Sequence, residues 1–222
     1  LFWGDAGIGL SIMGSGLAAA GIAASGTPEQ VMEWGPQCYG SAENLMLGAF
    51  ASSEPDAGSD VAAIRTRAVY EESTDEWVIN GTKTWISNGR EGNCVALLVK
   101  TDTEVEPRHK GMSLFLAEKG PGFEASKKLE KLGYKGIDSA ELIFDDYRIS
   151  VDDLIGGAEG QGFYQTMGGL ELGRINVAAR GVGVANAALK DATSYAQIRE
   201  TMGKPIGQHQ AIQTKLGDMA TR

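Results

Sequence analysis

The feature that most constrains this chain is a long helical repeat near its C-terminal end. From Gly162 onward, apolar and small residues return every three or four positions, which is the period of one face of an α-helix. The repeat reaches Arg199, so the helix would be about 55 Å long at 1.5 Å per residue. Its Ala- and Gly-rich face predicts close packing against other helices, in a bundle or across a subunit contact. The repeat consists of Phe163, Met167, Leu170, Arg174, Ala178, Val182, Ala185, Leu189 and Ala192.

The middle of the chain predicts a β-sheet. Short apolar runs separated by polar loops are typical of buried strands. Asn80-Gly81 lies between two β-forming runs and predicts a hairpin turn there. The expected strands cover residues 61–70, 77–79, 82–86, 95–99, 112–117 and 141–144. Several short strands of this kind favour a small β-barrel or a sandwich.

The first part of the chain predicts helices. Thr27 and Gln30 have the spacing of a capping box, with Pro28 at the first helical position. Residues 6–26 carry no charge and are long enough to cross a membrane. They consist mostly of Gly, Ala and Ser, which favours a buried helix packed through small residues, so we predict no integral membrane segment. No basic region precedes them, and a signal peptide is not predicted.

Together these patterns predict an α+β fold in three parts. Residues 1–44 form a helical segment, residues 45–157 a domain of short strands that is a barrel or a sandwich, and residues 158–222 a region of long helices. The chain starts at Leu1 inside an apolar pattern and runs to Arg222 without a stop signal. We therefore expect an internal fragment of a longer protein.

Composition narrows the possible partners. A net charge of −9 and a pI near 4.8 argue against nucleic acid or an anionic membrane. The two Cys, Cys38 and Cys94, and the two His, His109 and His209, lack the spacing of a metal site, so no metal is predicted. The low Cys content fits a reducing compartment. We expect a cytoplasmic protein, or one of the mitochondrial matrix in a eukaryote.

Two polar stretches are candidates for a binding site. The first, Phe50-Ala-Ser-Ser-Glu-Pro-Asp-Ala-Gly-Ser-Asp60, places hydroxyls, a Pro turn and a Gly directly after an apolar pair. The second, Lys83-Thr-Trp-Ile-Ser-Asn-Gly89, puts Trp85 and Ser87 on one face of a strand, which suits a flat ligand with polar edges. Taken singly, the first stretch is equally consistent with an ordinary turn, and Trp85 with a side chain covering a barrel core.

With a third stretch, these motifs resemble the acyl-CoA dehydrogenase family. The third is Arg199-Glu-Thr-Met-Gly-Lys-Pro-Ile-Gly-Gln-His-Gln-Ala-Ile-Gln213, in which Met202 stands where the family usually has Phe. The three motifs follow the family's order over nearly the whole chain. The resemblance implies a middle β-barrel domain preceded by the end of an N-terminal helical domain. The rest of that domain and most of the C-terminal helical domain would be absent.

The resemblance also implies an FAD held between the barrel and the C-terminal helices. Its implied contacts form three groups: at the flavin ring, at the pyrophosphates of FAD and acyl-CoA, and at the FAD of a neighbouring subunit. In that order they are Phe50, Ser53, Trp85 and Ser87; Gly58 and Ser59; and Arg199 and Gln210. The family usually has Thr in place of Ser53 and Ser87, and Ser keeps the hydroxyl donor. Arg199 has an alternative role as a cation at a helix end.

The implied substrate is an acyl-CoA thioester, contacted by Ser59, Glu171 and Arg174. Some members carry a base Glu on the long helix, but here Gly173 occupies that position. Glu171 lies about 200° around the helix from it, so it faces elsewhere. We expect the base Glu beyond Arg222, and thus no catalytic residue within this chain. For Arg174, its apolar neighbours favour a half-buried ion pair over direct catalysis.

The implied activity is that of an FAD-dependent acyl-CoA dehydrogenase, an oxidoreductase of fatty acid β-oxidation that acts on CH–CH bonds. A base removes the α proton of the thioester, and the β hydride passes to flavin N5, which yields a trans-2-enoyl-CoA. Electrons would go to an electron-transferring flavoprotein, and a homotetramer is the expected assembly. Two alternatives stay open: an oxygen-using relative of the acyl-CoA oxidase or nitroalkane oxidase type, and an inactive homologue that serves as a binding module.

Overall fold

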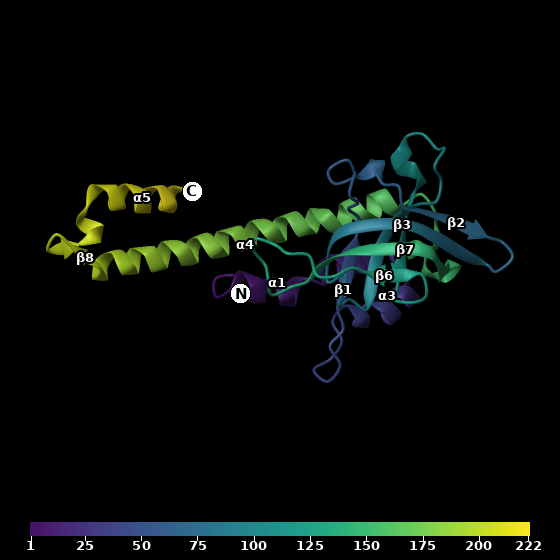
Figure 1. The fold of residues 1–222 in the computed structure, drawn as a ribbon, viewed down its shortest axis with the longest axis horizontal. Coiled ribbons are helices and arrows are strands. Elements are labelled where there is room, and N and C mark those ends of the chain that lie inside the picture. Colours follow the sequence, from purple (N-terminus) through teal and green to yellow (C-terminus); the bar gives the residue numbers. More distant parts are fainter.

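The computed structural model describes residues 1–222 and confirms the α+β class: a curled sheet packs against helices, and one long helix extends away from it (Figure 1). The helices are α1 (Ala6–Met13), α2 (Gly16–Ser25), α3 (Pro28–Trp34), α4 (Gly162–Ile198) and α5 (Gln210–Thr221). The strands are β1 (Gly48–Ala51), β2 (Arg67–Glu71), β3 (Glu76–Ser87), β4 (Cys94–Lys100), β5 (Met112–Ala117), β6 (Phe123–Ala125), β7 (Ser139–Ser150), β8 (Glu200–Thr201) and β9 (Lys204–Pro205).

Seven strands form one curled sheet, a half-barrel, in the order β1-β4-β2-β3-β7-β6, and β5 pairs with β4. β1 runs parallel to β4, whereas β3 and β7 form a long antiparallel pair. Of the run expected at 61–70, only the part from Arg67 is a strand, because Val61–Ala63 form a short 3₁₀ turn. The first polar stretch therefore leaves the sheet at the end of β1, and the second lies at the end of β3.

β4 is buried on both faces. Val95, Leu97 and Val99 belong to the core inside the half-barrel, and the alternate residues Ala96 and Leu98 belong to a second core with α2 and α3. A strand buried on both faces needs a continuous apolar run instead of an alternating one. The continuous apolar run at residues 95–99 therefore predicts β4 correctly.

The single helix expected over residues 6–26 is wrong, because α1 and α2 are separated at Gly14 and Ser15. The Ser15 hydroxyl accepts a 2.9 Å hydrogen bond from the Gly48 amide of β1. By length and composition the stretch Ala6–Ser25 could cross a membrane, yet α2 lies against β1 and α4. The capping box at α3 is confirmed, with Thr27 and Gln30 bonded reciprocally at 3.1 and 3.2 Å.

α4 confirms the predicted long helix. Its first turns pack against β5 and α2, and the remainder projects away from the half-barrel (Figure 1). The short β8–β9 ribbon then reverses the chain, and α5 packs back against α4. One helix thus connects the half-barrel to a distant tip.

The hairpin predicted at Asn80-Gly81 is wrong, because β3 continues unbroken along β7. Between Ile79 and Gly81 the register against β7 shifts, as in a β-bulge. Gly81 has a φ of 148°, and a Cβ there would come within 2.6 Å of Thr66 Cα. Asn80 exchanges hydrogen bonds of 3.1 and 2.9 Å with Asp146 on β7. One β3 residue, Asn80, stands opposite two β7 residues, Asp145 and Asp146, so the bulge lies in β7 and the Asn-Gly pair faces it instead of forming a turn.

Candidate functional site

A buried ion pair fixes the loop after β1 to β3. Lys83 Nζ donates to Glu54 Oε1 at 2.8 Å and to the Ser52 carbonyl at 3.2 Å, and its side chain is fully buried. Glu54 also accepts hydrogen bonds from the backbone amides of Arg65 and Thr66 at 2.6 and 3.0 Å. The Glu54 carboxylate thereby closes residues 54–66 into a loop and holds that loop against the second motif.

Burial and pairing shift the pKa of both charged groups. Burial lowers the pKa of Lys83 to about 8, while the adjacent Glu54 carboxylate acts in the opposite direction. For Glu54, burial acts to raise the pKa, but the charge of Lys83 and the accepted hydrogen bonds outweigh it and keep the pKa below its usual value. Both groups are therefore charged at neutral pH, and neither has another counter-ion within the chain.

Trp85 occupies a bulge in β3, where Thr84 and Trp85 stand opposite Glu141 of β7. The register against β7 shifts between Lys83 and Ile86, so the regular alternation assumed for Trp85 and Ser87 is interrupted. Trp85 has a φ of 60°, which bulky residues rarely adopt, and it is 62% exposed. The positive φ and the exposed indole both destabilise the folded protein. Backbone strain of this kind is concentrated at functional sites, which makes Trp85 a candidate binding residue.

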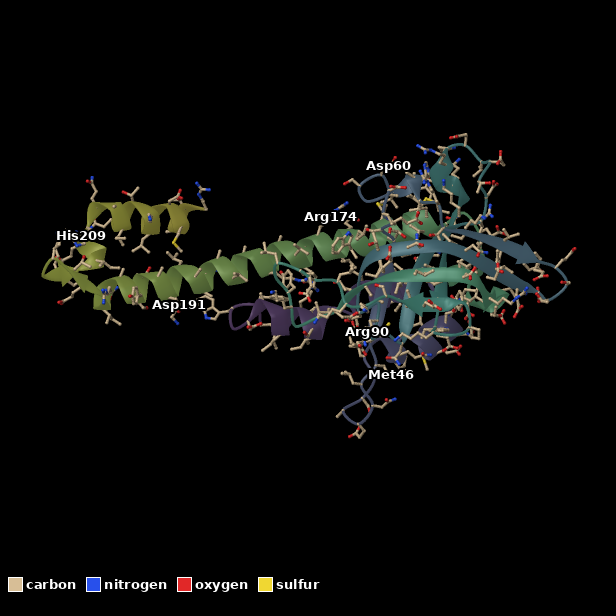
Figure 2. All side chains as sticks on the ribbon, in the orientation of Figure 1. Met46, Asp60, Arg90, Arg174, Asp191 and His209 are labelled. Atoms are coloured by element: carbon tan, nitrogen blue, oxygen red, sulfur yellow. The ribbon has the colours of Figure 1, made fainter.

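Ser87 lies in a cleft of about 460 Å³ between the end of β3 and α4. Gly173, Arg174 and Arg180 of α4 line the same cleft, and Met13 lies on its N-terminal side. Figure 2 shows Arg174 where α4 reaches the half-barrel. The structure thus brings together Ser87 and Arg174, two predicted site residues that are far apart in sequence. Arg174 forms no ion pair within the chain, so the half-buried ion pair expected for it is not present there.

The other predicted residues of the two motifs do not line the cleft, and they differ in accessibility. Ser53 and Ser87 are half-buried and Ser59 is exposed, and the three hydroxyls form no hydrogen bonds within the chain. Gly58 faces open space, since a Cβ there would meet no atom within 4 Å. Phe50 packs against the second core. Free hydroxyls, an exposed indole and an open backbone fit a flat cofactor with polar edges, which is the chemistry of FAD.

Arg199 and Gln210 lie at the opposite end of α4. Arg199 follows its last residue, and Gln210 begins α5. From Arg174 to Arg199 the helix advances about 37 Å at 1.5 Å per residue, and Figure 2 shows the adjacent His209 at the distant tip. Arg199 and Gln210 therefore cannot contact a ligand that lies in the cleft of their own chain. Glu171 is exposed on α4 and does not line the cleft.

Two parts of the site were missed by the sequence interpretation. Lys83 is one, although a signal was available, because strand alternation places it on the same face as Trp77 and Ile79. The other is the N-terminal wall of the cleft, where Met13 and Leu17 lie. Their own sequence pattern indicates only an apolar helix, since the contact across the cleft is long-range.

Two family models match this chain. "Acyl-CoA dehydrogenase, middle domain" matches residues 49–147, and "Acyl-CoA dehydrogenase, C-terminal domain" matches residues 160–222. The half-barrel with both polar motifs falls in the first range, and the long helix of the cleft falls in the second. The chain belongs to the acyl-CoA dehydrogenase family.

Similar proteins cover the chain almost completely. A (2S)-methylsuccinyl-CoA dehydrogenase of Cereibacter sphaeroides is 40% identical over 96% of this chain and 40% of its own length. The structure of butyryl-CoA dehydrogenase from Megasphaera elsdenii matches with a TM-score of 0.88 at 36% identity, over 100% of this chain and 56% of that chain. A glutaryl-CoA dehydrogenase of Mycobacterium smegmatis in complex with FADH2 gives 0.82 at 31% identity, over 95% and 51%. The chain thus spans about half the length of these relatives, or less.

Proposed function

We propose that this protein is an FAD-dependent acyl-CoA dehydrogenase, which converts an acyl-CoA thioester to a trans-2-enoyl-CoA. The observation that carries the proposal is Trp85, an exposed indole held in a strained bulge two residues before Ser87, which lines the cleft. The relatives support it, because one is named for butyryl-CoA and another was solved with FADH2.

The chain's own residues would position the cofactor. Trp85 would stack on the flavin ring beside Phe50, and the hydroxyls of Ser53 and Ser87 would donate hydrogen bonds to its polar edge. The Lys83–Glu54 pair does not touch the flavin in this proposal; it would fix the loop that carries Ser53 relative to the strand that carries Trp85. When bound, the flavin supplies the group that accepts the hydride from the substrate's β carbon.

The substrate and the remaining parts of the cofactor have separate proposed contacts. Ser59, Glu171 and Arg174 would bind the acyl-CoA, and Gly58 would let the pyrophosphate approach the backbone. Removal of the α proton needs a base in a dry site. Gly173 supplies no carboxylate, so we place the base Glu outside residues 1–222.

The tip of α4 would serve a second copy of the chain. Arg199 and Gln210 would contact the FAD of a neighbouring subunit in a homotetramer, Arg199 as a partner of its phosphates. Electrons would pass to an electron-transferring flavoprotein, in the cytoplasm or in the mitochondrial matrix of a eukaryote. An oxygen-using relative would instead release hydrogen peroxide.

The test uses the full-length protein, purified without added cofactor and then mixed with acyl-CoAs under anaerobic conditions. A flavin spectrum that bleaches with one class of acyl-CoA is the expected result. Trp85→Ala should weaken FAD affinity by about 10- to 100-fold, the range for losing one aromatic stacking partner, whereas Trp85→Phe should retain most of it. Full FAD affinity in Trp85→Ala would show that the cofactor site is misplaced.

A further inference from the structure

Arg180 is a cation in the cleft that has no anionic partner in the chain. It lines the cleft beside Ser87 and also two adjoining hollows of about 620 and 250 Å³, and all three share Met13. The ion pairs of the chain involve other residues, so none neutralises Arg180. A half-buried guanidinium without a carboxylate is costly unless a ligand supplies one.

Two contacts hold the guanidinium in place and leave its outer nitrogens free. Arg180 Nε donates to Asn176 Oδ1 at 2.7 Å, and the guanidinium carbon lies 5.1 Å from the centroid of the Phe2 ring. These contacts use one of the five N–H groups and one face of the plane. The four N–H groups on the Nη atoms form no hydrogen bonds within the chain, and their fork geometry matches a carboxylate.

The helix face that leads to Arg180 is suited to an apolar chain. Gly173, Val177 and Arg180 are spaced at four and three residues, so they lie on one face of α4 and all line the cleft. Gly173 leaves room beside Leu17, whose Cδ2 atom a Cβ would approach to 2.9 Å. About 10.5 Å of helix separates Gly173 from Arg180. A long side chain on a helix leans back toward the N-terminus, so the guanidinium lies nearer to Gly173 than this and leaves room for a short acyl chain.

The anion that fits this position is a carboxylate and not a phosphate of CoA. Half of the residues that line the cleft are hydrophobic. Such a wall accommodates methylene groups and carboxylates paired with Arg180 or Arg174, the two cations of the cleft. It would not accommodate the larger negative charge of a pyrophosphate beside the apolar residues.

We propose that Arg180 determines specificity by pairing with a carboxylate at the far end of the acyl chain. The preferred substrates would then be short ω-carboxyacyl-CoA esters. This inference rests on the proposed function, because it assumes that the cleft holds the acyl group of an acyl-CoA.

The experiment compares matched substrates on the full-length, FAD-loaded protein. Anaerobic flavin reduction is measured with glutaryl-CoA against pentanoyl-CoA, and with adipyl-CoA against hexanoyl-CoA, so that each pair differs in the terminal carboxylate. The variants are Arg180→Met, which removes the charge, and Arg180→Lys, which keeps the charge without the fork. Lys190→Met is the control, because Lys190 lies on the same helix, 5.4 Å from the Trp3 ring, and does not line the cleft.

We expect the wild-type protein to prefer the carboxylated member of each pair. Arg180→Met should lower kcat/KM for that member by about 10- to 150-fold, the range for a hydrogen bond to a charged group, and leave the uncharged member unchanged. Arg180→Lys should fall between, and Lys190→Met should match wild type. The ratio between substrates is measured within one preparation, so a poorly folded variant cannot imitate the result.

Two outcomes would overturn the inference while leaving the proposed function intact. One is a wild-type protein that reduces pentanoyl-CoA at least as well as glutaryl-CoA. The other is an equal loss for both members in Arg180→Met, which would assign Arg180 to a phosphate of CoA or to packing. If no acyl-CoA bleaches the flavin of the wild-type protein, the proposed function itself fails and the inference fails with it.

Discussion

At the scale of single residues, Lys83 is the position where one substitution should disturb the site most. Lys83→Met leaves the Glu54 carboxylate buried without its counter-ion, which costs about 3–5 kcal/mol of unfolding free energy. Urea denaturation of the purified protein measures this loss. The double variant Lys83→Met with Glu54→Gln should recover part of it, because Gln is neutral. The Arg65 and Thr66 amides bond to different oxygens of Glu54, so the single carbonyl of Gln keeps one of these two hydrogen bonds.

An exposed ion pair in the same loop provides the control for Lys83. Arg65 and Asp56 lie 3.1 Å apart, but their side chains are 77% and 69% exposed. Exposed pairs contribute about 0–1 kcal/mol, so Arg65→Met should change the unfolding free energy by no more than that. Equal losses in Lys83→Met and Arg65→Met would mean that burial does not set the strength of the Lys83–Glu54 pair.

Asp153, at the end of a 3₁₀ turn after β7, should make stability depend on pH. Burial raises its pKa to about 6 from 3.8, and the carboxylates of Glu33, Glu118 and Asp152 act in the same direction. Between pH 3.8 and 6 the folded protein therefore binds more protons than the unfolded chain, so this residue's contribution to stability falls as the pH rises. Above pH 6 the Asp153 carboxylate is ionised in both states, and its burial then destabilises the folded protein. Partial exposure limits this destabilisation to about 1 kcal/mol.

The variant Asp153→Asn tests this dependence. It should raise the thermal unfolding temperature at pH 7.5, because the buried charge is removed, and the gain should shrink as the pH is lowered to 4. Melting curves of wild type and variant across this range provide the measurement. A gain that stays constant with pH would rule out titration of Asp153 as its cause.

At the scale of elements, Gly81 of β3, which lies beside the β7 bulge, should tolerate no side chain. Gly81→Ala would place a Cβ 2.5 Å from Thr66 Oγ1 and 2.6 Å from Thr66 Cα, and the backbone atom cannot move by rotation alone. We expect a loss of about 1–3 kcal/mol, as for overpacking in a core. In the control Gly168→Ala, the Cβ would meet no atom within 4 Å on α4, and stability should rise by about 0.5–1 kcal/mol. Chemical denaturation measures the change in unfolding free energy for both variants. A change of the same sign in both would contradict the expected clash at Gly81.

Elements with a long helical period or a bounded apolar run could be predicted from the sequence. Elements that depend on which strands pair with one another could not. α4 was predicted within a residue of its bounds because its period persists over many turns, and β5 because its apolar run is bounded by polar loops. The Asn80-Gly81 signal was local, and the extended pairing of β3 with β7 overrode it. β6 has only three residues, too few for any period.

The candidate site shows the same division. Ser87 and Arg174 were named from the resemblance, and the fold places both at one cleft. Met13 was not named, because nothing within α1 indicates what its apolar side chain faces. Lys83 lies within the second motif, but a Lys is ordinarily exposed, and its burial depends on a contact with Glu54, 29 residues away in the sequence. The roles proposed for these residues stay predictions.

At the scale of the whole molecule, the tip of α4 should be needed for cofactor retention. Arg199→Ala would remove the proposed charged partner of a neighbouring subunit's FAD, which should weaken FAD affinity by about 10- to 150-fold. The FAD-to-protein absorbance ratio and the mass in solution are the measurements. Lys204→Ala, an exposed cation on the same ribbon, is the control and should behave as wild type. Unchanged cofactor content and assembly in Arg199→Ala would refute the proposed role of the tip.

The division of the chain into parts also belongs to this scale. The boundaries predicted at residues 44 and 157 stay predictions, because the structure shows α2 in contact with β1 and α4 in contact with β5. Each predicted part therefore packs against the half-barrel. Limited proteolysis at these two positions would show whether the parts are separable.

The length of α4 has a consequence for the inheritance of defects. On the proposed arrangement, a cleft and the tip that completes it belong to different chains, since about 37 Å of helix separates Arg174 from Arg199. In a cell with one normal and one altered gene copy, tetramers with both kinds of subunit would form. A subunit with a damaged tip would then cause a normal neighbouring subunit to lose its FAD. Mutations at the tip would then act dominantly, whereas mutations in the cleft would harm only their own chain and act recessively.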